Sequence, residues 1–345
     1  MDPGPEIGLQ VAAYLDGELV VDTWAGVADA ASGRRVDGDT IFMVSATAQG
    51  VVATLMHLLA ERGRLDYDAP VVCYWPEFGA NGKADVLVRH VLAHTAGVPR
   101  VDQQTPELLL DWDAMCAAIA ALPPMYPPGA HQAYHMFTFG YICGELIRRI
   151  DGRSVNAFLQ DELCRSLEIE GLYFGVPDDQ ASRVATLADS PDQRGAYGAA
   201  FFNRPEVVRA SIPSMGGFAT ARAMARHYAM LANGGALDGV RLLSPQRLRV
   251  AAEVHAPPMD ALYAMYGKRG LGYRLEEDAG PGAGPHAFGH IGGGASFAYA
   301  DPDRHFAVAL TKNYLLPPAR VVDRYQPPEV CREAYDAVRE ALGLT

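Results

Sequence analysis

His290 stands two residues before a run of three glycines, Gly292 to Gly294. Histidine is the side chain whose ordinary pKa lies near neutral pH, so it can accept and donate protons in enzymes. Glycine has no Cβ, which lets a ligand approach the backbone closely. We therefore expect His290, Gly292 and Gly293 to line a ligand site, with a hydrogen-bonded structural histidine as the alternative.

The nucleophile motifs of common hydrolases are absent from this sequence. In Ser-x-x-Lys, the i, i+3 spacing puts both side chains on one face of a helix, where a neutral lysine can take the serine proton. The lysines and the residues three positions before them are Lys83 with Ala80, Lys268 with Met265, and Lys312 with Ala309. Gly-x-Ser-x-Gly, His-Glu-x-x-His and Gly-x-x-x-x-Gly-Lys are also missing. No metal or cofactor is therefore expected.

Alternating and helical patterns predict the elements that hold such a site. From Leu9 to Val21 the pattern is strand-like and is broken at Asp16-Gly17, which is typical of a hairpin with a tight turn. Apolar residues then recur at helical spacing from Thr47 to Arg62, with Gly63 as the predicted C-cap. We expect a buried helix whose first turn is capped by a serine or threonine near Ser45.

The middle of the chain differs in character from its two ends. Residues 71–204 are rich in proline and in helical patterns, and we predict an inserted helical lobe there. Residues 1–70 and 205–345 are predicted to form a discontinuous α/β sheet domain, to which strand-like runs after residue 270 return the chain. An amphipathic helix is predicted from Pro328 to Leu342. The predicted fold class is α/β, of the α+β kind.

The composition indicates one compact body of enzyme size. Of the 345 residues, 49% are hydrophobic and 20% are charged, which is a globular balance. The formal net charge is −12 and no basic stripe is present, which argues against nucleic acid or a membrane as a partner. Five scattered cysteines without C-x-x-C, and no leader-like or membrane-spanning run, favour a cytoplasmic location. We expect a small organic molecule as the ligand.

Short motifs spread over nearly the whole chain occur in the order known from one superfamily. They lie at residues 40–42, 58–66, 68–71, 75–78, 92–99, 128–135, 219–222, 231–235, 289–294 and 301–302. In this order they resemble the serine β-lactamases, penicillin-binding proteins and class C-like (family VIII) esterases. The esterase branch is the most similar, since His290 occupies the place where β-lactamases carry a lysine. The resemblance implies a β-lactamase-like fold, with an antiparallel sheet flanked by helices and an inserted all-helical lobe.

The superfamily's serine and lysine fall on positions that cannot perform its acyl chemistry. Counted without gaps from Phe42, the serine position is Ala46 and the lysine position is Gln49. Alanine has no nucleophile, and a glutamine amide is no base near neutral pH. A one-residue insertion would make Ser45 the serine, but Ala48 then stands at the lysine position. Covalent acylation at the superfamily's position is therefore not expected.

The resemblance also assigns the remaining site residues. Tyr134 matches the tyrosine of the second motif, which helps to move protons, and its phenol can act as a general acid or orient a substrate. His290 is expected on the edge strand that faces the former nucleophile. We predict Tyr134 and His290 as catalytic residues and Ser45, Gln49 and His135 as substrate contacts, with Gln49, Tyr134 and His290 meeting between the two lobes. A packed structural role is the alternative for Tyr134 and His135.

Three functions fit these residues. The leading hypothesis is an enzyme that performs non-covalent acid/base chemistry, such as a cyclisation, condensation or rearrangement in specialised metabolism, by holding reactive groups together and stabilising charge. The second is a hydrolase or acyltransferase for esters or amides that uses Ser45 or a water activated with His290. The third is a pseudoenzyme that only binds a ligand. None of the three requires a cofactor or metal.

Overall fold

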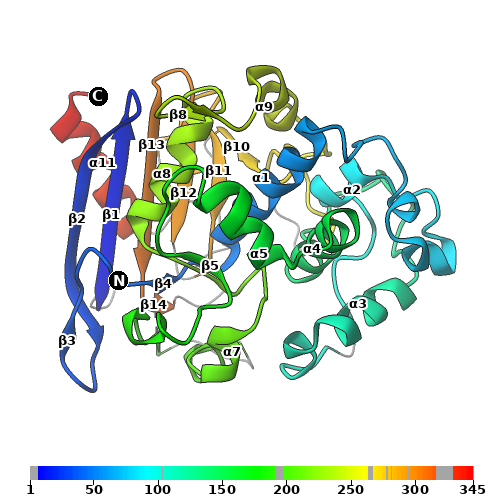
Figure 1. Ribbon diagram of the computed structural model, residues 1–345, viewed down its shortest axis with the longest axis horizontal. Helices are drawn as coiled ribbons and strands as arrows, with labels where there is room; N and C mark the ends of the chain where they lie inside the picture. Colours follow the sequence, from blue (N-terminus) through cyan, green and yellow to red (C-terminus); the bar gives the residue numbers. More distant parts are fainter. Residues whose placement is uncertain are drawn as a thin grey trace.

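The structure is a computed structural model that describes residues 7–344 apart from 103, 192–196, 263–266, 277–278, 281, 294–295 and 316–328. Its largest sheet consists of β1 (Gly8–Leu15), β2 (Glu18–Asp29), β3 (Arg34–Arg35), β10 (Arg274–Leu275), β11 (Phe288–Ile291), β12 (Phe297–Asp301) and β13 (Phe306–Lys312). The strand order is β10-β11-β12-β13-β1-β2-β3 (Figure 1). Every pair of neighbours is antiparallel. Both ends of the chain therefore share one sheet, and the predicted α/β class with an antiparallel sheet is confirmed.

β1 and β2 form the predicted N-terminal hairpin. Leu15 pairs with Glu18 across the two-residue turn. Asp16 and Gly17 are both left-handed, with φ of 51° and 85°. Turns of this kind match the right-handed twist of the flanking strands, and Asp-Gly adopts them at low cost. The predicted turn is confirmed.

Helices cover both faces of the large sheet (Figure 1). α8 (Ala221–Ala232) packs against β1 and β13, where small side chains such as Ala12 and Ala309 let the helix come close. α11 (Glu329–Leu342) covers the opposite face, where Tyr335 packs in one apolar cluster with Val11. Val11 and Ala12 point to opposite faces because side chains alternate along a strand. The predicted start of α11 at Pro328 lies outside the described residues.

The stretch 71–204 is mainly helical, with two short strands. Its helices are α2 (Val88–Leu92), α3 (Trp112–Ala121), α4 (Thr138–Asp151), α5 (Val155–Leu159) and α6 (Ala199–Phe202). β5 (Leu172–Phe174) pairs with β7 (Gly217–Ala219), and β6 (Ala188–Asp189) pairs with β14 (Tyr314–Leu315). The lobe is therefore not helical throughout, because strands of two or three residues leave no alternating pattern and their partners lie outside the lobe's own sequence.

Smaller elements complete the fold. β4 (Phe42–Met43) joins β7 and β5 in a three-stranded sheet, immediately before the central helix. The others are α7 (Pro205–Arg209), β8 (Ala236–Leu237), β9 (Val240–Arg241) and α9 (Pro245–Ala252).

α1 (Ala48–Glu61) is the central helix of the molecule. Every residue from Ala48 to Ala60 is buried, so the helix is enclosed on all sides. It packs on α4 of the lobe and on β11 of the sheet. Gly63, with φ of 68°, follows the helix as the predicted left-handed residue. Because α1 touches both parts of the molecule, its first turn is held rigidly between them.

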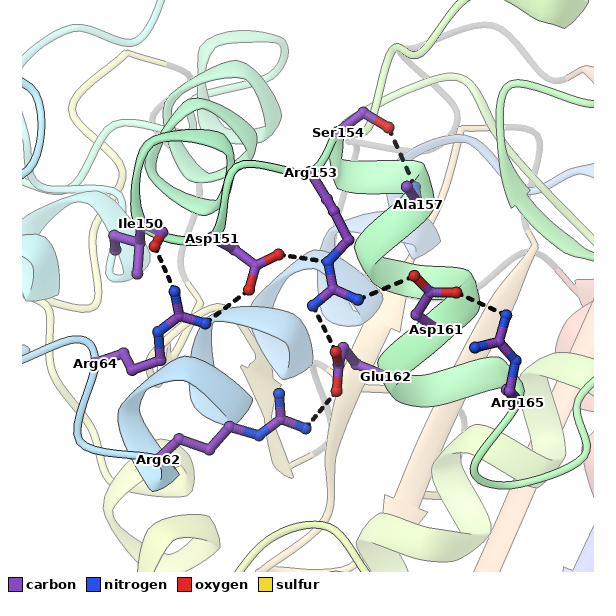
Figure 2. A network of polar contacts seen from close by, with 10 residues as sticks. All are labelled: Arg62, Arg64, Ile150, Asp151, Arg153, Ser154, Ala157, Asp161, Glu162 and Arg165. Carbon is purple, nitrogen blue, oxygen red and sulfur yellow. Dashed lines mark hydrogen bonds and ion pairs between the residues drawn. The ribbon is translucent and has the colours of Figure 1, made fainter.

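A network of arginines and carboxylates ties the end of α1 to the lobe (Figure 2). Arg62 bonds to Glu162 and Arg64 to Asp151, both at 2.6 Å. Arg153 lies at the centre of the network and reaches Asp151, Asp161 and Glu162. Single exposed ion pairs contribute little, about 0–1 kcal/mol. Here Asp151 and Glu162 are each shared by two arginines, and the network as a whole fixes the chain at the end of α1 against the lobe.

Lys83 stabilises the lobe from within. Its side chain is fully buried, and its ammonium group donates to the carbonyl oxygens of Ala80 at 2.7 Å, of Ala120 at 2.9 Å, and of Leu122. We expect Lys83→Met to lower the free energy of unfolding by about 1–3 kcal/mol, because buried acceptors that lose their donor pay their desolvation cost. Urea unfolding followed by circular dichroism measures the change.

Lys268→Met is the matched control for that prediction. Lys268 pairs with Glu276 at 2.7 Å with about a third of its side chain exposed, so its replacement should cost no more than about 1 kcal/mol. Equal stability losses in the two variants would contradict the role assigned to Lys83.

Candidate functional site

The turn before α1 is joined to the turn between β11 and β12. Thr47 Oγ1 bonds to the Ser296 carbonyl oxygen at 3.1 Å, and Ser296 Oγ donates to the Val44 carbonyl oxygen at 2.8 Å. Gly292 donates its own N–H to the Ser296 carbonyl oxygen at 2.7 Å. A Cβ on Gly292 would lie 2.4 Å from the Val44 oxygen. Gly292 is thus required for packing in this direction, and its assignment as a substrate contact stays a prediction.

Ser45 sits beside this junction in an unusual backbone conformation. Its φ is 50°, in the left-handed region, and its side chain is buried. The Ser45 hydroxyl donates to Met215 Sδ at 3.5 Å, a weak acceptor. A Cβ on Gly293 would lie 3.3 Å from Ser45 Oγ, so Gly293 remains next to the site. Neither Ser45 nor Thr47 caps α1 with its side chain, because Met215 and Ser296 take these hydroxyls instead.

Gln49 lies on the first turn of α1, three residues after Ala46. The Gln49 side chain is completely buried, and its Nε2 donates to the Met136 carbonyl oxygen at 3.2 Å. Its Oε1 has no hydrogen-bond partner among the described residues. Since Met136 follows Tyr134 by two positions, this bond joins α1 to the segment that carries the tyrosine.

Tyr134 is half-buried and lies among aromatic and charged groups. Its ring centroid is 4.9 Å from that of His94 and 6.3 Å from that of His290. The guanidinium carbon of Arg269 lies 5.5 Å from the same ring. The Tyr134 backbone N–H donates to Asp260 Oδ2 at 2.7 Å, which fixes the segment. The structure therefore brings Tyr134 and His290 together and links Gln49 to them through Met136.

His290 lies on β11 just beyond its pairing with β10. Only Phe288 and Gly289 pair with β10, so β11 is the second strand of the sheet and not the predicted edge strand. β10 has only two residues, so β11 extends past it at His290 and Ile291. His290 Nδ1 lies 2.9 Å from the Ile291 carbonyl oxygen. A carbonyl only accepts, so Nδ1 carries the proton and Nε2 is an acceptor.

The second ring nitrogen of His290 has no partner in the part of the chain that the structure describes. Nε2 is buried and makes no hydrogen bond to the described residues. Burial, followed by the positive charges of Arg269 and Arg274, holds the pKa of His290 well below its ordinary value of 6.5. His290 is therefore neutral at pH 7. It offers an acceptor to whatever occupies the site.

His135 has a structural position. Its ring is completely buried, its Nδ1 donates to the Ala133 carbonyl oxygen at 2.6 Å, and its Nε2 accepts from the Val98 N–H at 3.3 Å. Burial lowers its pKa to about 4. Both ring nitrogens are thus occupied by backbone, which corrects the assignment of His135 as a substrate contact.

Three residues near Tyr134 were not anticipated from the sequence. They are Asp260, Arg269 and Arg274, all buried. Arg269 and Arg274 pair across the turn that leads into β10. They belong to no recognisable motif, and they reach Tyr134 and His290 only through contacts between distant parts of the chain.

The site combines one phenol with two buried acceptors from different elements. Gln49 Oε1 comes from α1 and His290 Nε2 from β11. Each of these acceptors can take a hydrogen bond from a ligand or a water molecule. Within the described part of the chain, no group of three or more His, Cys, Asp or Glu side chains is placed to hold a metal ion. Nor is any described helix long and apolar enough to cross a membrane.

Comparison with known proteins gives consistent relatives. A family model described as Beta-lactamase matches residues 1–330. The esterase/beta-lactamase LipL of Mycobacterium tuberculosis is 35% identical over 354 residues, covering 94% of this chain and 81% of LipL. A penicillin-binding protein homologue from Caulobacter crescentus has a TM-score of 0.82 and 36% identity, covering 92% of this chain and 89% of its own. A family VIII carboxylesterase has a TM-score of 0.85 and 32% identity, covering 90% and 88%.

Proposed function

Because this chain belongs to the β-lactamase family, we propose that it hydrolyses carboxylic esters, with a bound water molecule in place of the missing serine nucleophile. Relatives named as esterases support hydrolysis ahead of the cyclisation, condensation or rearrangement that the sequence suggested. The substitution of the nucleophile is a property of this sequence, which has Ala46 and Gln49 at the serine and lysine positions.

The observation that carries the proposal is a pair of buried acceptors, Gln49 Oε1 and His290 Nε2, which no described residue satisfies. A buried acceptor without a donor costs about 1–3 kcal/mol, so a small donor is favoured there. One water molecule can give a hydrogen to each acceptor. Its lone pairs then remain free to attack an acyl carbon near Ala46, where the absent hydroxyl leaves room.

Tyr134 is proposed to move the proton. The water oxygen forms a bond to the acyl carbon, and the bond from that carbon to the alcohol oxygen breaks. During attack the water turns one hydrogen from the Gln49 acceptor to the Tyr134 oxygen. The phenol gives its own proton to the departing alcohol oxygen and takes this water proton, so that acid and alcohol leave and Tyr134 returns to its starting state. His290 stays neutral and orients the water, because burial first, and then the neighbouring arginines, hold its pKa well below 6.5.

Ser45 is the second candidate nucleophile. Its left-handed backbone, with φ of 50°, is a strained conformation of the kind that accumulates at functional sites. Against this role stands Ala48, which is three residues further on and cannot act as a base. The water and serine mechanisms differ in whether an acyl-enzyme forms.

We expect turnover of p-nitrophenyl butyrate without covalent modification of the chain. Ser45→Ala should leave kcat/KM unchanged, whereas Gln49→Leu, which removes the acceptor, should lower it about tenfold, the equivalent of one hydrogen bond. Ester hydrolysis is followed by absorbance, and the chain by intact-mass spectrometry with the ester and with an activated phosphonate. A stable adduct at Ser45, or loss of turnover in Ser45→Ala, would replace the water mechanism with the serine mechanism.

A further inference from the structure

We propose that Arg269 is a positioning residue for Tyr134, whose guanidinium group supplies the positive charge that stabilises the Tyr134 phenolate. The inference rests on the proposed function insofar as Tyr134 moves the proton there. The two positions at which the superfamily carries lysines hold Gln49 and His290 in this chain. Arg269 is the residue that supplies a positive charge in their place.

The geometry places the charge over the ring and holds it there. The Arg269 guanidinium carbon is 5.5 Å from the centroid of the Tyr134 ring, and Arg269 is only 3% exposed. The backbone of Arg269 pairs with Arg274, and its carbonyl oxygen accepts from the His255 N–H at 2.8 Å. Gly270 packs so tightly that a Cβ would lie 2.2 Å from the Ala251 oxygen. The backbone of Arg269 is therefore fixed, and so is the position from which its side chain extends.

Other titratable groups also face Tyr134. His94 and His290 have ring centroids 4.9 and 6.3 Å from the Tyr134 ring, and burial keeps the pKa of each well below 6.5. Both are therefore neutral at pH 7. Asp260 carries a negative charge nearby, but its carboxylate accepts from the backbone N–H groups of Tyr134 and Leu262, at 2.7 and 2.8 Å. This carboxylate is thus held on the backbone of Tyr134, while Arg269 lies over its ring.

The same positive charge has opposite effects on two kinds of acid. A cation within about 4–6 Å favours the charged form of a phenol and disfavours the charged form of an imidazole. Arg269 is the first, and Arg274 the second, of the charges that lower the pKa of His290. The arginine charge that adds to the effect of burial on the pKa of His290 therefore favours Tyr134 as the group that gives up its proton. Tyr134 is thus the proton-transfer group and His290 the neutral acceptor, and neither role requires a lysine.

Spectroscopic titration of the tyrosines tests the assignment without any substrate. The chain has 16 tyrosines, and the difference between parent and Tyr134→Phe isolates the tyrosinate absorbance of Tyr134. We expect this residue to titrate at least about one pH unit below the ordinary tyrosine pKa of about 10. Arg269→Met should raise that titration by about 1–3 pH units, and Arg269→Lys should restore part of the shift.

Arg247 provides the matched control. Its guanidinium carbon lies 5.3 Å from the centroid of the Tyr67 ring, so Arg247→Met removes a similar pair and should leave the Tyr134 titration unchanged. Circular dichroism checks the fold of each variant, and Arg269→Gln replaces Arg269→Met if the latter does not fold. An identical Tyr134 titration in the parent and the neutral variant would overturn the proposal. Ester hydrolysis could still hold in that case, because the titration measures no turnover.

Discussion

Tyr134→Phe is expected to lower kcat/KM for p-nitrophenyl butyrate by about 10²–10⁴-fold, the usual contribution of a positioned proton donor or acceptor. The change keeps the ring that packs against His94 and removes only the hydroxyl, so the fold should be retained. Tyr74→Phe is the control, because the Tyr74 hydroxyl accepts from the Asp66 N–H far along the chain from the site. Parental turnover in Tyr134→Phe would show that the tyrosine is structural.

His290→Ala should lower kcat/KM about tenfold, as expected for Gln49→Leu, since the attacking water loses one acceptor that orients it. The pH dependence distinguishes the structure from the sequence-based expectation. A histidine in water would produce an inflection near pH 6.5, whereas buried His290 has a pKa well below that value. We therefore expect the pH profiles of kcat/KM for the parent and for His290→Ala to have the same shape near pH 6.5. No step there should be present in the parent and absent from the variant. Such a step would mean that His290 is solvated.

Acidification is expected to destabilise the protein steeply below about pH 6.5. Burial lowers the pKa of six histidines, one of which is the half-buried His90. For the five buried ones the pKa falls to about 3 for His57 and His227, to about 4 for His135, and well below 6.5 for His94 and His290. Above pH 6.5 neither the folded nor the unfolded chain protonates them, so stability is unaffected there. Below it, the unfolded chain binds protons that the folded chain does not.

The expected size follows from linkage. Each such histidine lowers the free energy of unfolding by up to about 1.4 kcal/mol per pH unit, and five together rival a typical total stability of about 5–15 kcal/mol within two pH units. Urea unfolding at a series of pH values measures the slope. His57→Gln should reduce the slope by the contribution of one proton, up to about 1.4 kcal/mol per pH unit. His286→Gln should leave the slope unchanged, because 72% of the His286 side chain is exposed. Constant stability between about pH 7 and 5 would contradict the burial of these rings.

The sequence by itself determined the local elements and the chemistry that is missing. The hairpin at Asp16-Gly17 and the helix ended by Gly63 depend on residues close together in the chain. The spacing and backbone preferences of such residues can be recognised in the sequence alone. The absence of Ser-x-x-Lys is likewise a property of the sequence alone. These patterns were enough to predict the antiparallel sheet, the buried helix and the proximity of Tyr134 to His290 through the family resemblance.

Only the tertiary structure decided what each candidate side chain can do. His135 is structural because its ring nitrogens bond to the neighbouring Ala133 and to the distant Val98, and Gly292 packs against Val44 of another element. Arg269 contacts Tyr134 although the two are 135 positions apart in the chain, and no periodic pattern in the sequence indicates such a contact. Burial and long-range charge set the protonation of His290, and both depend on which segments meet in space, so no local pattern encodes them.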